Sequence, residues 1–159
     1  MAQAYKHDID AERVKQIICT NCQALIDVSH LPFFSRIKCP KCEMSQIVPA
    51  RFGGFLLVGR LGSGGMGVIY DALDKELGRR VALKIMKKDL SASEEFVRSF
   101  KHEAQAAAAL NHPNVVQIYS FGQVNGQFYI AMELVSGGRL DEPGCRSTGL
   151  CSPHICDAR

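Results

Sequence analysis

Residues 61–84 read LGSGGMGVIYDALDKELGRRVALK, and this stretch decides how the middle of the chain is expected to fold. Gly62, Gly64 and Gly67 follow the pattern G-x-G-x-x-G, which lets a backbone approach phosphate groups closely and direct N–H groups at them. The pattern alone is weak, because it also occurs in dinucleotide-binding folds and in flexible loops. A dinucleotide fold needs a helix directly after the glycines. Residues 68–73 are β-branched and aromatic instead, so the sequence predicts a strand there.

Further elements are predicted on both sides of the glycines. Apolar residues 55–61 form a strand before them, and residues 79–86 form a third strand with a central lysine, Lys84. Two more strands, over 115–120 and 127–134, are joined by a turn at Asn125-Gly126. Together with one helix between the third and fourth strands, these segments predict five strands and one helix.

The helix is expected to start at a capping box, Ser91-x-x-Glu94, and to stop at Asn111-His112-Pro113. Glu103 lies beside its apolar face, towards the predicted sheet. A carboxylate that is buried or half-buried there would be costly without a cationic partner. The expected apolar face consists of Phe96, Phe100, Ala104, Ala107 and Leu110.

The glycine pattern followed by Ile69, the V-A-L-K stretch that ends at Lys84, and the helix residue Glu103 together resemble the N-terminal lobe of protein kinases. The sequences of residues 64–70 and 111–116 are similar to those of bacterial Ser/Thr kinases of eukaryotic type. This resemblance implies an α+β fold, a five-stranded antiparallel sheet with one helix.

The resemblance also implies an ATP site. Lys84 is implied to contact the α- and β-phosphates, and Glu103 to pair with it and hold it there. A solvated strand lysine and a surface glutamate are the alternative interpretations of these two residues. Met132 is implied to lie at the back of the adenine pocket, whereas Glu133 and Val135 would offer backbone groups to adenine. The ATP-binding residues implied in this way are Leu61, Gly62, Gly64, Gly67, Ile69, Ala82, Lys84, Glu103, Met132, Glu133 and Val135.

The motifs that carry phosphoryl transfer in this family are not found in the chain. The 159 residues contain no H-R-D, D-F-G or A-P-E sequence. We therefore predict no catalytic residue and no magnesium ligand here, and a chain that is inactive alone. Residues 142–159 show no helical or strand period, so we interpret them as an irregular tail, with an out-of-frame end as one hypothesis.

Two cysteine pairs occur before the kinase-like stretch. Cys19-x-x-Cys22 and Cys39-x-x-Cys42 are separated by sixteen residues. Each pair can aim two thiolates at one point, and two such pairs on facing hairpins close a tetrahedral zinc site. A segment this small buries too little apolar surface to fold alone, and zinc would supply the missing free energy. We predict a small β zinc ribbon with a structural zinc; a redox C-x-x-C motif and unligated cysteines are the alternatives.

The amino-acid composition limits the kinds of partner that the chain is expected to bind. The formal net charge of +3 is too small to indicate nucleic acid or a membrane. Residues 1–50 hold six Lys or Arg against five Asp or Glu, and a four-thiolate zinc site adds about two negative charges, so we expect no nucleic-acid partner. The chain has no signal-peptide core, and its apolar runs are too short to span a membrane, so we expect a cytoplasmic protein.

We therefore divide the chain into a zinc ribbon at 1–50, a linker at 51–54, a truncated kinase N-lobe at 55–141 and the tail at 142–159. The predicted function is the ATP-binding lobe of a Ser/Thr protein kinase. Its expected partners are ATP and, in a full-length form, protein substrates or a regulatory protein. The alternative is a non-catalytic, zinc-dependent protein-interaction module built on a kinase-like scaffold.

Overall fold

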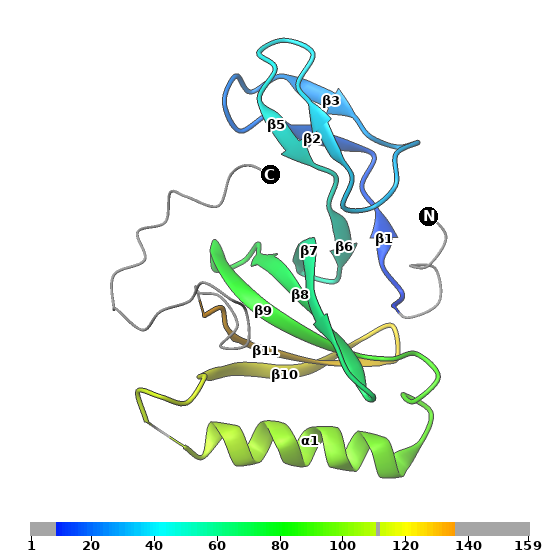
Figure 1. Cartoon of the computed structure of the whole chain (residues 1–159). Helices are drawn as coiled ribbons and strands as arrows, with labels where there is room; N and C mark the ends of the chain where they lie inside the picture. Colours follow the sequence, from blue (N-terminus) through cyan, green and yellow to red (C-terminus); the bar gives the residue numbers. More distant parts are fainter. Residues whose placement is uncertain (1–8, 111, 136–159) are drawn as a thin grey trace, which may run out of the picture.

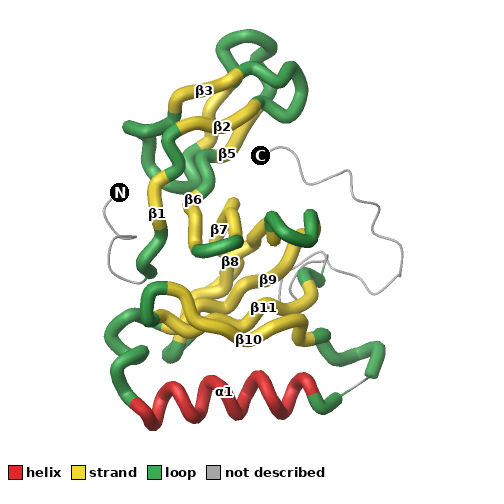
Figure 2. The backbone as a smooth tube through the Cα atoms, turned by 180° about the vertical axis from the view of Figure 1, so that it is seen from behind, coloured by secondary structure: helices red, strands yellow, loops and turns green. Residues whose placement is uncertain are grey.

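The computed structural model describes residues 9–110 and 112–135. The predicted tail at 142–159 and the first eight residues of the predicted ribbon lie outside this part of the chain. One helix lies along one face of a large sheet, and a small β-rich ribbon sits at the opposite end of the molecule (Figures 1 and 2). Within the described residues, no helix has the length and apolar character needed to cross a lipid bilayer.

The large sheet has seven strands in the order β1-β6-β7-β8-β9-β11-β10, and every neighbouring pair is antiparallel. The five strands predicted from the sequence correspond to β7 to β11, although the fourth, predicted at 115–120, is found at Ile118–Val124. The predicted count of five is wrong because two further strands join the sheet. The strands are β1 (Glu12–Arg13), β6 (Ala50–Phe52), β7 (Phe55–Ser63), β8 (Gly67–Asp74), β9 (Arg79–Met86), β10 (Ile118–Val124) and β11 (Gln127–Glu133).

One of the extra strands, β6, comes mostly from the segment predicted as a linker, whereas the other, β1, lies within the predicted ribbon. Residues 51–52 belong to β6, and Gly53 and Gly54 form the turn to β7, with Gly53 at φ 55°. Phe52 is fully buried in the core of the sheet, and Phe55 is buried on the other side of the turn. Burial of these two aromatic rings explains why the segment forms a hairpin with β7 in place of a free linker.

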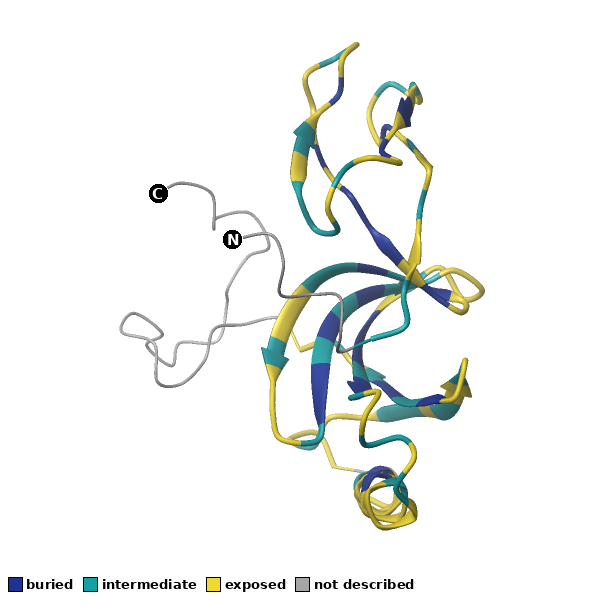
Figure 3. Cartoon of the chain, turned by 90° about the vertical axis from the view of Figure 1, so that its right-hand side faces the viewer, coloured by how far each residue is buried: buried dark blue, intermediate teal, exposed yellow. Residues whose placement is uncertain are grey.

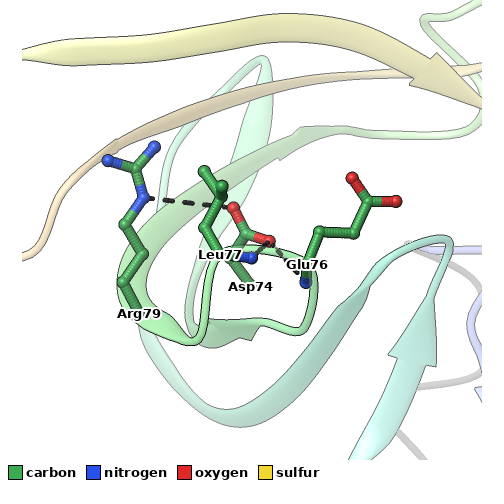
Figure 4. A network of polar contacts seen from close by, with 4 residues as sticks. All are labelled: Asp74, Glu76, Leu77 and Arg79. Atoms are coloured by element: carbon green, nitrogen blue, oxygen red, sulfur yellow. Dashed lines mark hydrogen bonds and ion pairs between the residues drawn. The ribbon is translucent and has the colours of Figure 1, made fainter.

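Two turns show why the strands pair as they do. Asn125 and Gly126 have φ values of 48° and 82°, as a two-residue type I′ hairpin requires, so the predicted turn between β10 and β11 is confirmed. Between β8 and β9, the Asp74 carboxylate accepts hydrogen bonds from the backbone N–H groups of Glu76 and Leu77 at 3.1 and 3.2 Å (Figure 4). The same carboxylate lies 4.0 Å from Arg79 Nε, which closes the turn.

The helix, α1 (Glu94–Ala108), packs one narrow face against the sheet (Figure 3). Phe100 and Ala104 are buried, but Phe96 is 40% exposed and Leu110 is 59% exposed, so the predicted apolar face is wrong at both ends. Val97 is partly buried against the cluster that contains Phe100, whereas Phe96 is not, so the packed stripe passes on the Val97 side of the helix.

The predicted capping box is not formed. Ser93 is the N-cap and makes no side-chain cap hydrogen bond, whereas the Ser91 hydroxyl donates to the carbonyl of Lys87 at 3.2 Å. The helix ends with Ala109 as its C-cap, so Leu110 lies beyond it, and the predicted stop at Asn111 falls on a residue outside the described part.

Alternating side chains of the central strands fill two separate cores. Along β9, Val81, Leu83 and Ile85 join an apolar cluster on one face of the sheet. Met86 points to the other face, where it packs with Phe100 of α1 in a second cluster. The sheet thus has two faces with separate cores. The helix covers one face, and parts of the ribbon pack on the other, to which β6 contributes buried side chains.

The ribbon consists of two antiparallel hairpins, β2 (Gln16–Ile18) with β3 (Leu25–Asp27) and β4 (Arg36–Lys38) with β5 (Ser45–Ile47). It is an insertion in a hairpin of the large sheet, because β1 before it pairs with β6 after it. Its backbone path therefore starts and ends on the large sheet.

Candidate functional site

The first part of the candidate site is the tip of the β7–β8 hairpin, which carries the three glycines. The Gly64 N–H donates to the Gly67 carbonyl at 2.9 Å and closes the tip. The Lys87 N–H donates to the Met66 carbonyl at 3.1 Å, which ties the tip to the end of β9. The loop is therefore held at its base and open at its apex.

The three glycines of the loop have different structural roles. A Cβ at Gly67 would lie 2.6 Å from the carbonyl oxygen of Ile85, in the neighbouring strand β9. At Gly62 and Gly64, a Cβ would have no heavy atom within 4 Å. Gly67 is therefore needed for close packing of β8 on β9, whereas Gly62 and Gly64 leave space beside the backbone where a ligand can approach.

The second part is an ion pair between the sheet and the helix. Lys84 Nζ lies 2.6 Å from Oε1 and 2.8 Å from Oε2 of Glu103. The Lys84 side chain is 17% exposed, because it lies in the middle of the sheet between Ile69 of β8 and Ile130 of β11. Its Nζ is also 5.5 Å from the ring centroid of Phe100, which anchors α1.

Glu103 reaches Lys84 because it lies on α1 between the two buried anchors, Phe100 and Ala104. Its side chain is 48% exposed, so the carboxylate is half-buried, and the predicted pairing with Lys84 is observed. Both acceptor oxygens contact one ammonium group, which holds the lysine on the face of the sheet that α1 covers.

The remaining predicted site residues lie on β7, β8, β9 and β11 or shortly after β11. Strand register places Ile69 beside Lys84 and Met132 beside Ala82, so these side chains share one face of the sheet. Ala82 is buried and Met132 is partly buried, whereas Leu61 on β7 is exposed. The Glu133 N–H donates to the Gln117 carbonyl at 2.9 Å, and Val135 is exposed beyond the end of β11.

One buried polar residue near the site was missed from the sequence. Gln127 is almost completely buried; its Oε1 accepts from the Asp10 N–H at 2.6 Å, and its Nε2 donates to the Met86 carbonyl at 2.8 Å. It therefore connects the chain before β1 with the end of β9, close to the base of the glycine loop. In the sequence it is only a polar residue after a turn, so no local signal indicates this role.

The four cysteines of the ribbon come together at one point. All four Sγ atoms lie within 4.8 Å of one another, and Cys19–Cys42 and Cys22–Cys39 are each separated by 3.6 Å. A tetrahedral zinc–thiolate site, with Zn–S bonds of about 2.3 Å, has sulfur–sulfur separations of about 3.8 Å. The sulfur positions therefore fit a single four-coordinate metal ion.

The two cysteine turns have the same backbone geometry. Gln23 and Glu43, each directly after the second cysteine of its pair, have φ values of 58° and 59°. Each donates its N–H to the carbonyl of the first cysteine, Gln23 to Cys19 at 3.1 Å and Glu43 to Cys39 at 2.8 Å. Two unrelated stretches of sequence thus adopt one knuckle, as expected where both must aim two sulfurs at the same point.

Without a cation, the four cysteine thiols cannot all be ionised at the same time. A backbone hydrogen bond from Ala24 favours the Cys22 thiolate, but burial and the three neighbouring sulfurs outweigh it and raise the pKa of Cys22 to about 12. A side-chain hydrogen bond from Asn21 and a backbone hydrogen bond from Met44 lower the pKa of Cys42 to about 6. The Cys22 thiol is therefore kept protonated at a pH where the Cys42 thiol is ionised. A divalent cation is the group that would allow all four thiols to ionise.

Comparison with known proteins identifies the family. A model of the protein kinase domain matches residues 55–152, which include the glycine loop, Lys84 and Glu103. The chain belongs to the protein kinase family. The kinase resemblance predicted from these residues is therefore confirmed, whereas the cysteine ribbon lies before the matched region.

Bacterial kinases are among the proteins to which this chain is similar. Serine/threonine-protein kinase PknA of Mycobacterium tuberculosis is 38% identical over 110 residues, which cover 66% of this chain and 26% of the relative. Serine/threonine-protein kinase PrkC of Bacillus subtilis is 43% identical over 90 residues, 57% of this chain and 14% of the relative. The crystal structure of the Mycobacterium tuberculosis PknI kinase domain is 34% identical with a TM-score of 0.46, and covers 55% of this chain and 35% of that one. The chain thus spans about a quarter or less of the length of these two curated relatives.

Proposed function

We propose that residues 55–141 are the ATP-binding N-terminal lobe of a Ser/Thr protein kinase. The observation that carries the proposal is the contact of Lys84 Nζ with both carboxylate oxygens of Glu103, at 2.6 and 2.8 Å. Kinases use a strand lysine paired with a helix glutamate to bind the α- and β-phosphates, and the pair must be formed for activity. Its presence beside an open glycine loop supports a lobe arranged to receive a nucleotide.

In this proposal the nucleotide lies under the β7–β8 hairpin. The phosphates would approach the backbone at Gly62 and Gly64, because nothing occupies the space beside these two glycines. The Gly64 N–H already donates to the Gly67 carbonyl, so other backbone N–H groups of the loop would bind the phosphates. Leu61, Ile69 and Ala82 would cover the adenine ring, with Met132 behind it. The Glu133 N–H is already bonded to Gln117, so Glu133 would offer its carbonyl and Val135 its backbone to the edge of adenine.

We also propose that the segment of residues 1–50 that lies between β1 and β6 is a zinc ribbon, with Cys19, Cys22, Cys39 and Cys42 as the four ligands. The mutual sulfur distances and the two equivalent knuckles support this assignment. Four thiolate ligands leave no open coordination position, so the zinc would be structural and would contribute folding energy. The linker at 51–54 is replaced in this division by the β6–β7 hairpin.

Transfer of the phosphoryl group from ATP to protein hydroxyls needs groups that these 159 residues do not contain. No residue of the chain matches the catalytic-loop Asp and Asn or the magnesium-binding Asp of the family. We therefore expect this chain alone to bind ATP without transferring its phosphate. Protein substrates, or a regulatory protein, are the partners proposed for the whole kinase.

The test is a titration of the metal-loaded chain with a fluorescent ATP analogue. Changing Lys84→Met removes the charge-assisted contact to phosphate, worth about 1.5–3 kcal/mol, so the affinity should fall roughly 10- to 100-fold. Lys75→Met is the matched control, because Lys75 is an exposed lysine in the β8–β9 turn. Equal affinities of the two variants, or no binding by the unchanged chain at millimolar analogue, would refute the nucleotide site.

Metal analysis of the same preparation tests the ribbon and the alternative function. We expect one zinc per chain, lost in the Cys39→Ser variant. A stable monomer that holds zinc but has no affinity for ATP would favour the non-catalytic interaction module. A well-folded chain that binds no metal would refute both the ribbon and that alternative.

A further inference from the structure

An aromatic residue of the ribbon contacts the back of the glycine-loop hairpin. Phe34 lies in the connection between β3 and β4, and its ring stacks on Tyr70 of β8 with centroids 5.9 Å apart and planes inclined by 30°. Tyr70 is 2% exposed and follows Gly67 by three positions in the same strand. The ribbon therefore packs against the strand that leads out of the glycine loop.

This contact is made on the face of the sheet opposite the proposed nucleotide. Ile69 pairs with Lys84, whereas the next residue, Tyr70, pairs with Leu83, and successive side chains of a strand point to opposite faces. Phe33 and Phe34 are both partly buried against the core on the Tyr70 face. The ribbon thus supports the hairpin from behind, without entering the space where the nucleotide would bind.

The backbone of Phe34 is held in a conformation that only a surrounding structure can impose. Its φ is 63°, in the left-handed region that a bulky residue rarely adopts. The Phe34 N–H donates to the carbonyl of Val48 at 2.7 Å, and the Val48 N–H donates to the carbonyl of Ser35 at 3.0 Å. Such strained conformations persist where neighbouring contacts over-determine them.

Val48 connects Phe34 to the cysteine cluster. It is fully buried in the small ribbon core, together with Cys19 and Cys39. Apart from the two cysteines, the buried members of that core are three aliphatic residues, too few to hold the ribbon together without a metal. The position of Phe34 therefore depends on the loaded cysteine site.

We propose that Phe34 is a positioning residue for the glycine loop, and that metal bound to the four cysteines holds it against Tyr70. Loading of the ribbon then orders the β7–β8 hairpin, and loss of the metal loosens it. The part of this inference that concerns the nucleotide rests on the proposed ATP site; the part that concerns the hairpin does not. By linkage, a nucleotide bound under the hairpin and a metal bound in the ribbon strengthen each other's binding by the same factor.

The test is amide hydrogen exchange of the full chain, followed in peptides that cover residues 55–74. Chelation of the metal should speed exchange in these peptides by about 3- to 10-fold, the factor expected for loss of one aromatic stack, beyond any change in the α1 peptides. Phe34→Gly should produce the same change with the metal still bound. Glycine adopts φ 63° without strain, so the ribbon itself should bind metal at least as tightly as before.

Two further variants separate positioning from general stability. Phe34→Tyr keeps an aromatic ring and should restore the protection of residues 55–74. Gln23→Gly relieves a similar left-handed backbone in the ribbon, at φ 58°, without removing a ring from the sheet, and should leave that protection unchanged.

Unchanged exchange of residues 55–74 after chelation or in Phe34→Gly would overturn the inference. Loss of metal from Phe34→Gly would also overturn it, because the ring would then serve the ribbon alone. A chain that shows the exchange response but binds no ATP analogue would refute the proposed nucleotide site and leave the role of Phe34 standing.

Discussion

Replacing Gly67 by alanine should destabilise the lobe, whereas the same change at Gly64 should not. A Cβ at Gly67 would lie 2.6 Å from the Ile85 carbonyl oxygen and 3.3 Å from the Ile85 carbonyl carbon. A carbon–oxygen contact is ordinarily about 3.3–3.6 Å, so the strands must separate by about 0.7 Å or more. Both contacting atoms are backbone, so no side-chain rotation relieves the overlap.

The cost follows from these contacts. Overpacking of this kind costs about 1–3 kcal/mol, and weakening one ladder hydrogen bond between β8 and β9 adds about 1 kcal/mol. We therefore expect Gly67→Ala to lower the free energy of unfolding by about 2–4 kcal/mol. Gly64→Ala has nothing within 4 Å of the new Cβ, so its effect should stay within about 0.5 kcal/mol, or be slightly stabilising.

Urea denaturation of the metal-loaded chain, followed by circular dichroism, measures both changes. Gly64→Ala is the internal control, because it makes the same chemical change three positions earlier in the same loop. Equal stabilities of the two variants would show that the close approach of β8 to β9 is not what requires glycine at position 67. The reasoning would then fail, whatever the effect of either change on nucleotide binding.

Three further predictions concern the ion pair and the knuckles. Glu103→Gln should lower the free energy of unfolding by less than about 1 kcal/mol, because the carboxylate is half-exposed. It should weaken binding of the ATP analogue about 3- to 10-fold, because Lys84 is no longer held in place. Denaturation and titration of one preparation measure the two effects. Iodoacetamide added together with a chelator meets the cysteines while they are still in the folded knuckles, where the pKa of Cys42 is about 6 and that of Cys22 about 12. It should therefore modify Cys42 before Cys22, at a rate that rises as the pH increases through about 6, and mass spectrometry showing Cys22 modified first would contradict this. Glu43→Gly should stabilise the metal-loaded ribbon by about 1 kcal/mol, because glycine adopts φ 59° without strain, whereas Lys41→Gly should not, and thermal unfolding compares them.

The parts of the fold that were predictable are those with local causes. The β10–β11 turn follows from Asn125-Gly126, whose φ values of 48° and 82° few other residue pairs accept. Strand β9 follows from the alternating apolar residues of 79–86, and its observed bounds are Arg79–Met86. Each cysteine pair is likewise a short-range signal, since its two sulfurs are only three positions apart in the sequence.

The parts that were not predictable depend on contacts between distant residues. Residues 51–54 look like a linker because nothing near them in the sequence shows that Phe52 will be buried under the sheet. The apolar face of α1 contains Phe96 by periodicity, but the way the helix packs on the sheet leaves Phe96 exposed and partly buries Val97. Hydrophobic periodicity predicts that the helix has an apolar face, but packing against the sheet decides which residues of that face are buried.

The sequence by itself determined the kinase family of this chain and predicted the residues of its two candidate sites. The order of glycines, lysine and glutamate predicted the pair of Lys84 and Glu103, because the chemistry of phosphate binding restricts which residue types can occur at those positions. Only the tertiary structure decided that Gly67 serves strand packing, that Gln127 ties the chain before β1 to β9, and that Phe34 reaches Tyr70. These three depend on which segments lie side by side in the folded chain, and close packing between segments far apart in the sequence leaves no periodic trace in it.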